Sequence, residues 1–281
     1  MISVKVGGSS IKIDKFNFPT GEVSVRLAGG EAHLPNTRAT KAIIDITFNY
    51  EADYEIIELA MIVDAVRRRY NKTDLELHLY MPYVPYSRQD RVCNTGEALS
   101  SKVLCDIINS MGFKTVTTLD NHSEVVTALL NNCINISPCN KVKDIVYNLL
   151  GRTGDKIALV SPDAGANKKV HAAAMLAGVP MVRCDKTRDL TTGKITGTTV
   201  INPTDFDISE YSLLVVDDIC DGGYTFNALA EELAKVTKGN LYLYVTHGKF
   251  TKGLDELKSN YKCVFTSNTL FAGDTFLKVL I

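Results

Sequence analysis

Leu213–Phe226, which reads LLVVDDICDGGYTF, is the segment most informative about the fold. Its first four residues are all apolar, which predicts a strand that is buried on both faces. Asp217 and Asp218 follow at the carboxyl end of this strand, and a Gly-Gly pair then opens a predicted helix. Because open α/β sheets bind ligands at the carboxyl ends of their strands, we expect a ligand site at this turn.

The chemistry of the turn favours a sugar phosphate. Adjacent carboxylates accept hydrogen bonds from the two hydroxyls of a vicinal diol. Free N–H groups at a helix N-terminus bind anions, and glycine lets the ligand approach the backbone closely. The predicted sugar-phosphate-binding residues are Asp217, Asp218, Asp221, Gly222, Gly223, Tyr224 and Thr225.

Strand and helix patterns alternate on both sides of this stretch, which predicts an α/β fold with mostly parallel sheets. Strands are expected at 21–27, 42–48, 75–80, 115–119, 157–160, 213–216 and 241–246. Helices are expected at 55–69, 100–111, 142–150, 169–176 and 226–236. The pattern predicts two similar domains, 1–139 and 140–267, and leaves open whether the tail 268–281 packs back on the first.

Composition excludes several classes of protein. The 281 residues are 45% hydrophobic and 22% charged with a net charge of -1, so no strongly basic nucleic-acid footprint exists at chain level. No apolar run is long enough for a membrane helix, and MISVKVGGSS lacks the pattern of a secretory signal, so we expect a cytoplasmic protein. The seven cysteines show no C-x-x-C spacing, and we expect buried free thiols.

Several motifs, in order along residues 18–250, resemble those of the ribose-phosphate pyrophosphokinase family. LLVVDDICDGGYTF resembles the motif for phosphoribosyl diphosphate (PRPP), which phosphoribosyltransferases share. Five further segments resemble motifs that are found in the pyrophosphokinases alone: FPTGEVSVRL, LYMPYVPYSRQDR, DNHSE, SPDAGANKK and DKTR. The resemblance implies two domains of the type I phosphoribosyltransferase kind.

The resemblance also implies an ATP pocket in the first domain. Its residues would be Phe18, Glu22, Arg88, Gln89, Asp90 and Arg91. The arginines suit phosphate oxygens, and the glutamine offers a donor and an acceptor to an adenine edge. Thr20 stands where the family has Asp, so one ATP contact differs.

The metal and transfer residues follow from the same resemblance. His122 and Asp163 would bind Mg²⁺, although Mg²⁺ ordinarily prefers oxygen ligands. Lys186 and Arg188, in a segment that we expect to be a loop, would be the catalytic cations that stabilise the transferring group.

The implied reaction is diphosphoryl transfer from ATP to the C1 hydroxyl of ribose 5-phosphate, giving PRPP and AMP, in a homo-oligomer (dimer or hexamer). Three alternatives stay open. Tyr224 offers a ring to a larger acceptor such as ADP-ribose. The second alternative is a phosphoribosyltransferase that consumes PRPP, and the third is a catalytically silent regulatory homologue.

Overall fold

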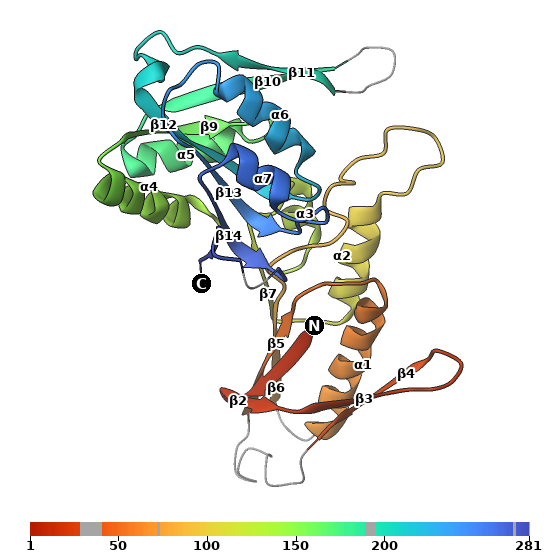
Figure 1. The fold of residues 1–281 in the computed structure, drawn as a ribbon. Coiled ribbons are helices and arrows are strands. Elements are labelled where there is room, and N and C mark those ends of the chain that lie inside the picture. Colours follow the sequence, from red (N-terminus) through yellow and green to blue (C-terminus); the bar gives the residue numbers. More distant parts are fainter. Residues whose placement is uncertain (29–40, 72–73, 189–194, 272–273, 281) are drawn as a thin grey trace. The chain divides into compact units, whose positions relative to one another are not determined.

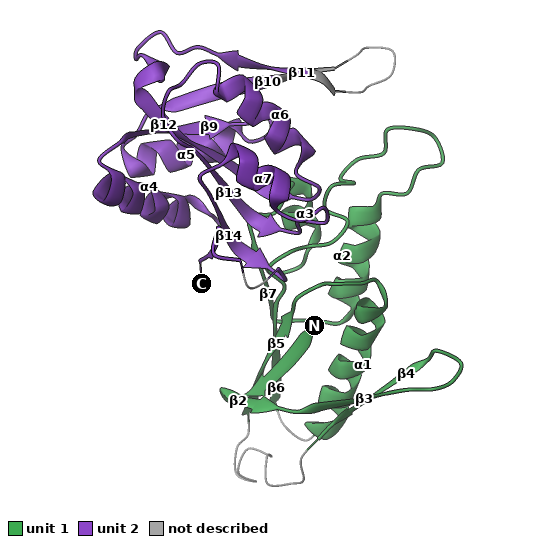
Figure 2. Ribbon diagram, viewed as in Figure 1, with its two compact units in different colours: residues 1–136 green, residues 137–281 purple. Residues whose placement is uncertain are grey.

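A computed structural model describes residues 1–28, 41–71, 74–188, 195–271 and 274–280, without the side chains of 186–188, 195 and 196. The chain divides into two compact units, Met1–Ile136 and Ser137–Ile281, which Figure 2 colours separately. This division falls three residues before the boundary expected from the sequence.

The first unit is built on a six-stranded sheet of order β2-β1-β5-β6-β7-β8. Strand β1 runs antiparallel to β2 and β5, whereas β5 to β8 are parallel to one another. The strands are β1 (Ile2–Val6), β2 (Ser9–Ile11), β5 (Lys41–Phe48), β6 (Asp74–Tyr80), β7 (Thr115–Leu119) and β8 (Cys133–Ile136). A separate hairpin joins β3 (Ile13–Asn17) to β4 (Val23–Leu27).

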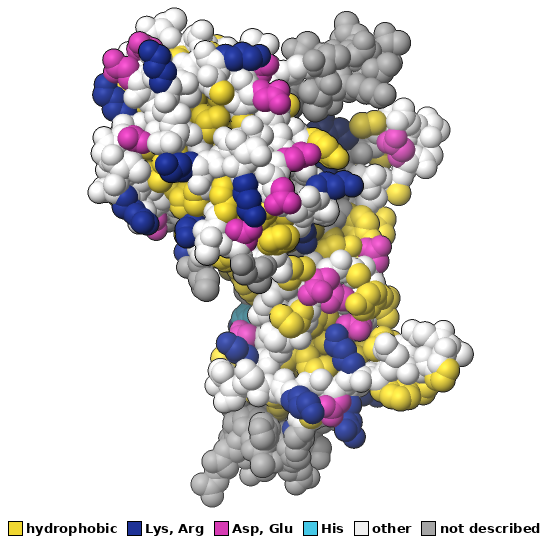
Figure 3. Space-filling model, viewed as in Figure 1, with side chains coloured by type: hydrophobic (Ala, Val, Ile, Leu, Met, Phe, Trp, Pro, Cys, Tyr) yellow, Lys and Arg dark blue, Asp and Glu magenta, His cyan; other side chains and the backbone are white. Residues whose placement is uncertain are grey.

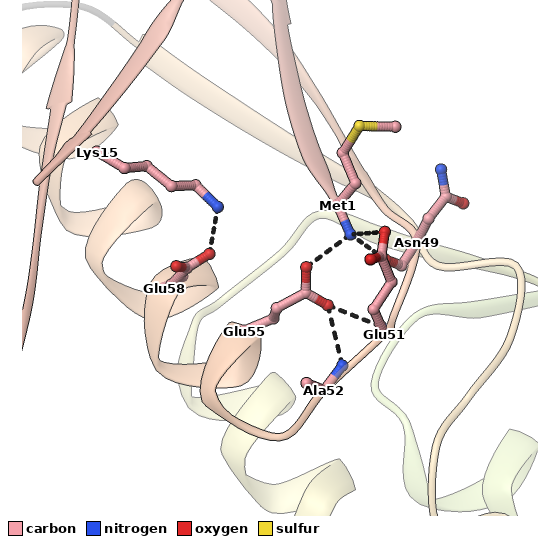
Figure 4. A network of polar contacts seen from close by, with 7 residues as sticks. All are labelled: Met1, Lys15, Asn49, Glu51, Ala52, Glu55 and Glu58. Atoms are coloured by element: carbon pink, nitrogen blue, oxygen red, sulfur yellow. Dashed lines mark hydrogen bonds and ion pairs between the residues drawn. The ribbon is translucent and has the colours of Figure 1, made fainter. Parts of the chain in front are cut away.

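Three helices accompany this sheet: α1 (Tyr54–Arg69), α2 (Ser100–Ser110) and α3 (Glu124–Leu129). Helix α1 buries Leu59, Ile62, Val63 and Val66, whose three- and four-residue steps form one apolar face against the core. Polar contacts fix this helix as well, as Figure 4 shows. Buried Glu58 pairs with Lys15 of β3, and so ties the hairpin to α1.

The second unit is built on a seven-stranded sheet of order β11-β10-β9-β12-β13-β14-β15. All its neighbours are parallel except β10 and β11, which form an antiparallel hairpin. The strands are β9 (Lys156–Ser161), β10 (Met181–Arg188), β11 (Ile195–Ile201), β12 (Tyr211–Cys220), β13 (Leu241–Gly248), β14 (Cys263–Thr269) and β15 (Leu277–Val279). Its helices are α4 (Cys139–Thr153), α5 (Asn167–Ala177), α6 (Tyr224–Leu233) and α7 (Asp255–Asn260), with a 3-10 turn, η2 (Ile208–Glu210).

Strand β12 has core on both faces, as its apolar sequence predicts. Leu213 and Val215 pack in a cluster with residues of α6 and α7. Leu214 and Val216 pack in a second cluster with residues of α4 and α5. The alternation of side chains along a strand therefore holds helices on both faces of this sheet, as Figure 1 shows. The predicted α/β fold, with two mostly parallel sheets and flanking helices, is confirmed.

One segment differs from expectation, and the place of the tail, which the sequence leaves open, is defined. The segment around Lys186 and Arg188 is expected to be a loop, but its described residues belong to strands β10 and β11, which pair from Arg183–Ile201 to Arg188–Ile195 and contain threonine, isoleucine and valine, residues that favour strands. The tail belongs to the second unit, because β15 pairs in parallel with β14. No helix among the described residues is long and apolar enough to span a membrane. All seven cysteines are free thiols, but the expectation of burial holds in full only for Cys105, Cys184 and Cys220. Cys93 is exposed, and the other three are partly buried.

Candidate functional site

The acidic pair lies inside β12, near its carboxyl end. Strand β12 continues past the predicted 213–216 to Cys220, because its ladder with β13 runs from Leu213–Leu241 to Cys220–Gly248. The backbone N–H of Asp218 donates to Asp217 Oδ1 at 2.9 Å. On α5, Lys169 places its Nζ 3.8 Å from Asp218 Oδ1.

Several groups set the charge state of this pair. Burial, followed by the neighbouring Asp218 carboxylate, raises the pKa of Asp217 well above its usual value. Lys169 opposes this rise, whereas the negative charge of Asp163 adds to it. Hydroxyl groups that donate to the pair, or a cation beside it, would favour the ionised form and lower this raised pKa.

The loop after β12 turns directly into α6. Gly223 has a φ of 83°, a left-handed conformation that glycine adopts without strain, and α6 begins at the next residue. The first turn of a helix leaves backbone N–H groups without partners in the helix. These groups, with Asp221 to Thr225 around them, form the predicted phosphate-binding loop.

Asp163 follows β9, the strand next to β12. Its Oδ1 accepts the N–H of Ala166 at 3.2 Å, and its carbonyl oxygen accepts the hydroxyl of Ser161 at 2.9 Å. These contacts place Asp163 at the same edge of the sheet as the acidic pair. Its carboxylate is the kind of oxygen ligand that Mg²⁺ takes together with substrate phosphates.

The predicted catalytic cations belong to the β10–β11 hairpin. The pairing of β10 with β9 ends at Arg183, but its pairing with β11 continues to Arg188, so the hairpin extends beyond the sheet as a two-stranded ribbon. The backbone of Lys186 lies opposite Thr198 in this ribbon. The side chains of Lys186 and Arg188 lie outside what the structure describes.

In the first unit, the segment Arg88–Arg91 lies in the long connection from β6 to α2. Asp90 accepts Arg91 Nε–H at 3.1 Å. Interactions with Ser123, above all, and with Arg91 hold the pKa of Asp90 below its usual value, and nearby His122 acts in the same direction. The predicted ATP segment thus contacts the DNHSE loop.

Phe18 and Glu22 lie at the tip of the β3–β4 hairpin. The Phe18 N–H donates to the Glu22 carbonyl at 2.8 Å, and Thr20 Oγ1 donates to Glu22 Oε2 at 2.8 Å. Figure 1 shows this tip well apart from the connection that precedes α2. The structure therefore does not gather the six predicted ATP residues into one place on the first unit.

The predicted metal ligands also come from different units, His122 from the first and Asp163 from the second. Their joint role stays a prediction. Within the described parts of the chain, no three His, Cys, Asp or Glu side chains form a group able to hold a metal ion.

Residues 1–112 match the model of the N-terminal domain of ribose phosphate pyrophosphokinase. A ribose-phosphate pyrophosphokinase of Thermococcus kodakarensis is 31% identical over 254 residues, covering 89% of this chain and 82% of that protein. The chain belongs to the ribose-phosphate pyrophosphokinase family. The resemblance stated from the sequence motifs is thus confirmed.

More distant members of the family agree. A ribose-phosphate pyrophosphokinase of Bradyrhizobium diazoefficiens is 28% identical, covering 81% of this chain and 69% of that protein. The fold is similar to a crystal structure of phosphoribosylpyrophosphate synthetase from Mycobacterium smegmatis, with a TM-score of 0.78 at 19% identity. That similarity covers 96% of this chain and 86% of the other, so it includes both units.

The structure adds residues that the sequence analysis did not single out. Lys169 contacts the acidic pair, and its place in SPDAGANKK is a usable signal, since two adjacent lysines end that motif. Thr251 donates its hydroxyl to Asp221 Oδ1 at 2.8 Å. No local sequence pattern predicts the contact between Thr251 and Asp221, because it depends on the register between β12 and β13.

Proposed function

We propose that this chain transfers the diphosphoryl group of ATP to the C1 hydroxyl of ribose 5-phosphate. The C1 oxygen bonds to the β-phosphorus of ATP, the bond from that phosphorus to the α,β-bridging oxygen breaks, and AMP leaves. The hydroxyl proton passes to solvent. The observation that carries this proposal is the acidic pair followed by a glycine loop at the end of β12, in a chain of this family.

The predicted site residues of the second unit each have a role in this reaction. Asp217 and Asp218 accept hydrogen bonds from the ribose diol. The loop from Asp221 to Thr225 binds the 5-phosphate through its N–H groups. Lys186 and Arg188, on the β10–β11 hairpin, neutralise the charge that develops on the β-phosphoryl oxygens and on AMP.

The first unit binds ATP in this proposal. Arg88 and Arg91 contact phosphate oxygens, with Asp90 holding Arg91 in place. Gln89 binds the adenine edge, whereas Phe18 and Glu22, apart from it at the hairpin tip, would contribute to an ATP site from another copy of the chain. Asp163 and His122 would hold Mg²⁺, which would screen the phosphate charges when bound.

We also propose a homo-oligomer, supported by an apolar surface on the first unit. Exposed hydrophobic residues recur along one face of α1, at Tyr54, Ile57 and Met61, and on α2 at Val103 and Ile107. Figure 3 shows hydrophobic side chains gathered where Figure 1 draws these two helices. Sedimentation at several protein concentrations would measure the assembly, and a monomer at every concentration would contradict it.

The experiment that tests the function is AMP release from ATP in the presence of Mg²⁺ and ribose 5-phosphate, without a nucleobase. The product should have the mass of the acceptor plus a diphosphate. A phosphoribosyltransferase would instead need PRPP and a base, and a silent homologue would release no AMP. A parallel reaction with ADP-ribose tests whether the acceptor is larger than ribose 5-phosphate.

A further inference from the structure

Two loops of the second unit meet beside the predicted phosphate site. One follows β12 and contains Asp221 to Gly223, and the other follows β13 and contains Lys249 to Gly253. Since Cys220 and Gly248 are partners in the parallel ladder, both loops leave the same edge of the sheet. The N–H of Thr251 donates to the Asp221 carbonyl at 3.0 Å, and that of Lys249 to the Cys220 carbonyl at 2.8 Å.

The loop after β13 is held firmly. Phe250 is buried and folds back over Gly248, where a Cβ would come within 2.1 Å of the phenyl ring, so only glycine fits. The N–H of Gly253 then closes a turn onto the Phe250 carbonyl at 2.8 Å. The backbone of Lys252, inside this turn, is therefore fixed relative to the phosphate loop.

Gly222 lies where the two loops meet, beside Tyr224 and Lys252. A Cβ built on it would lie 3.3 Å from Tyr224 Cε2 and 3.4 Å from Lys252 Cγ. The ring of Tyr224 and the stem of Lys252 thus converge over a position that carries no side chain. Glycine at 222 therefore leaves room for both side chains.

Lys252 is available for a ligand. It is exposed, and among the described residues it has no hydrogen bond or ion pair. Three flexible bonds separate its Cγ, beside Gly222, from its ammonium group. A lysine on such a stem binds phosphate as a compact positive charge.

We propose that Lys252 is a further binding residue of this site, and that its ammonium group contacts the 5-phosphate of the acceptor over Gly222. This inference rests on the proposed function, because it takes the loop after β12 as the phosphate site. Lys252 would add a positive charge from the loop after β13 to the N–H groups of the loop after β12.

Binding of ribose 5-phosphate, measured by calorimetry without ATP, tests the inference. Lys252→Met keeps the stem and removes the charge, and should weaken binding about 10- to 100-fold, the usual range for a charged hydrogen bond. Lys252→Arg should keep most of the affinity. Lys262→Met is the matched control, since Lys262 is equally exposed but precedes β14, at the opposite edge of the sheet.

The outcomes separate this inference from the proposed function. A Lys252→Met protein that binds within twofold of the unaltered chain overturns the inference, as does an equal loss in Lys262→Met. Absence of any ribose 5-phosphate binding by the unaltered chain overturns it as well. If binding depends on Lys252 but no AMP is released from ATP, the inference stands and the proposed diphosphoryl transfer fails.

Discussion

The two units place their predicted ligand residues in different ways. In the second unit, the acidic pair, Asp163 and the phosphate loop all lie at the carboxyl edge of one sheet, on neighbouring strands β9 and β12. In the first unit, Phe18 and Glu22 lie at a hairpin tip, apart from the connection that holds Arg88 to Arg91. A sheet edge fixes several loops at once, whereas a hairpin tip is fixed only through its own two strands and its anchor.

This difference predicts where substitutions act. Substitutions at the carboxyl edge of the second unit's sheet should alter acceptor binding and turnover. They should also alter the charge state of buried groups. Changes at the hairpin tip should affect ATP binding alone.

The largest effect is expected from Lys186→Ala. Its backbone lies in the ribbon that extends beyond the second sheet, and the proposed role is transition-state charge stabilisation. Loss of such a group lowers kcat by about 10²–10⁴-fold. The measurement is steady-state AMP release, with Lys262→Ala as control. Turnover close to that of the unaltered chain would remove Lys186 from the catalytic set.

Asp217→Asn should separate activity from stability. Hydroxyls of the bound diol favour the ionised form of Asp217, so removing this carboxylate should lower kcat/KM for ribose 5-phosphate about 10- to 100-fold. In the ligand-free chain, burial raises the folded pKa of Asp217, so the folded chain retains a proton that the unfolded chain has lost, and stability falls as pH rises above about 4. Removing the titrating carboxyl group should therefore raise Tm at neutral pH, by about 2–4 °C if that cost is about 1 kcal/mol.

Thermal unfolding across pH, with Asp144→Asn as control, checks the sign of that effect. Asp144 is exposed on α4 and takes no part in the proposed site. A Tm for Asp217→Asn that falls at neutral pH would show that the carboxylate is stabilised in the folded chain. The proposed opposition between binding and stability would then be wrong.

Phe18→Ala tests the hairpin tip. The ring is 47% exposed and contacts Phe16 edge to face, with ring centroids 5.0 Å apart, so its removal should barely change Tm. If the ring stacks on adenine, KM for ATP should rise about 10-fold, while KM for ribose 5-phosphate stays constant. Phe16→Ala is the matched control. Equal changes in both KM values would break the distinction between the two units.

Much of this architecture follows from local sequence. The apolar run LLVV predicts β12 and its two buried faces, and DNHSE and SPDAGANKK are correctly placed at the ends of strands. The β10–β11 hairpin was missed because Asp185, Lys186, Arg188 and Gly197 are weak strand formers. Pairing of the two strands outweighs that preference.

The contacts that complete the site are not local. Thr251 reaches Asp221, and Lys252 reaches Gly222, only because β12 and β13 are parallel with Cys220 opposite Gly248. A shift of one residue in that register would turn each side chain to the other face. Sequence motifs along a single segment carry no information on this register.

The smallest effect on ribose 5-phosphate is expected from Tyr224→Gly. The ring is 66% exposed and lies over Gly222, so a bare 5-phosphate loses no stacking partner when the ring is removed. We expect kcat/KM for ribose 5-phosphate to change by less than about threefold. An acceptor with an adenine beyond the phosphate would lose a stacking contact, worth about 1–3 kcal/mol. Parallel assays with ribose 5-phosphate and ADP-ribose distinguish the two cases. A loss of kcat/KM on ADP-ribose alone would show that this loop also contacts the part of the acceptor beyond the phosphate. Equal changes on both acceptors would show that Tyr224 only packs over Gly222.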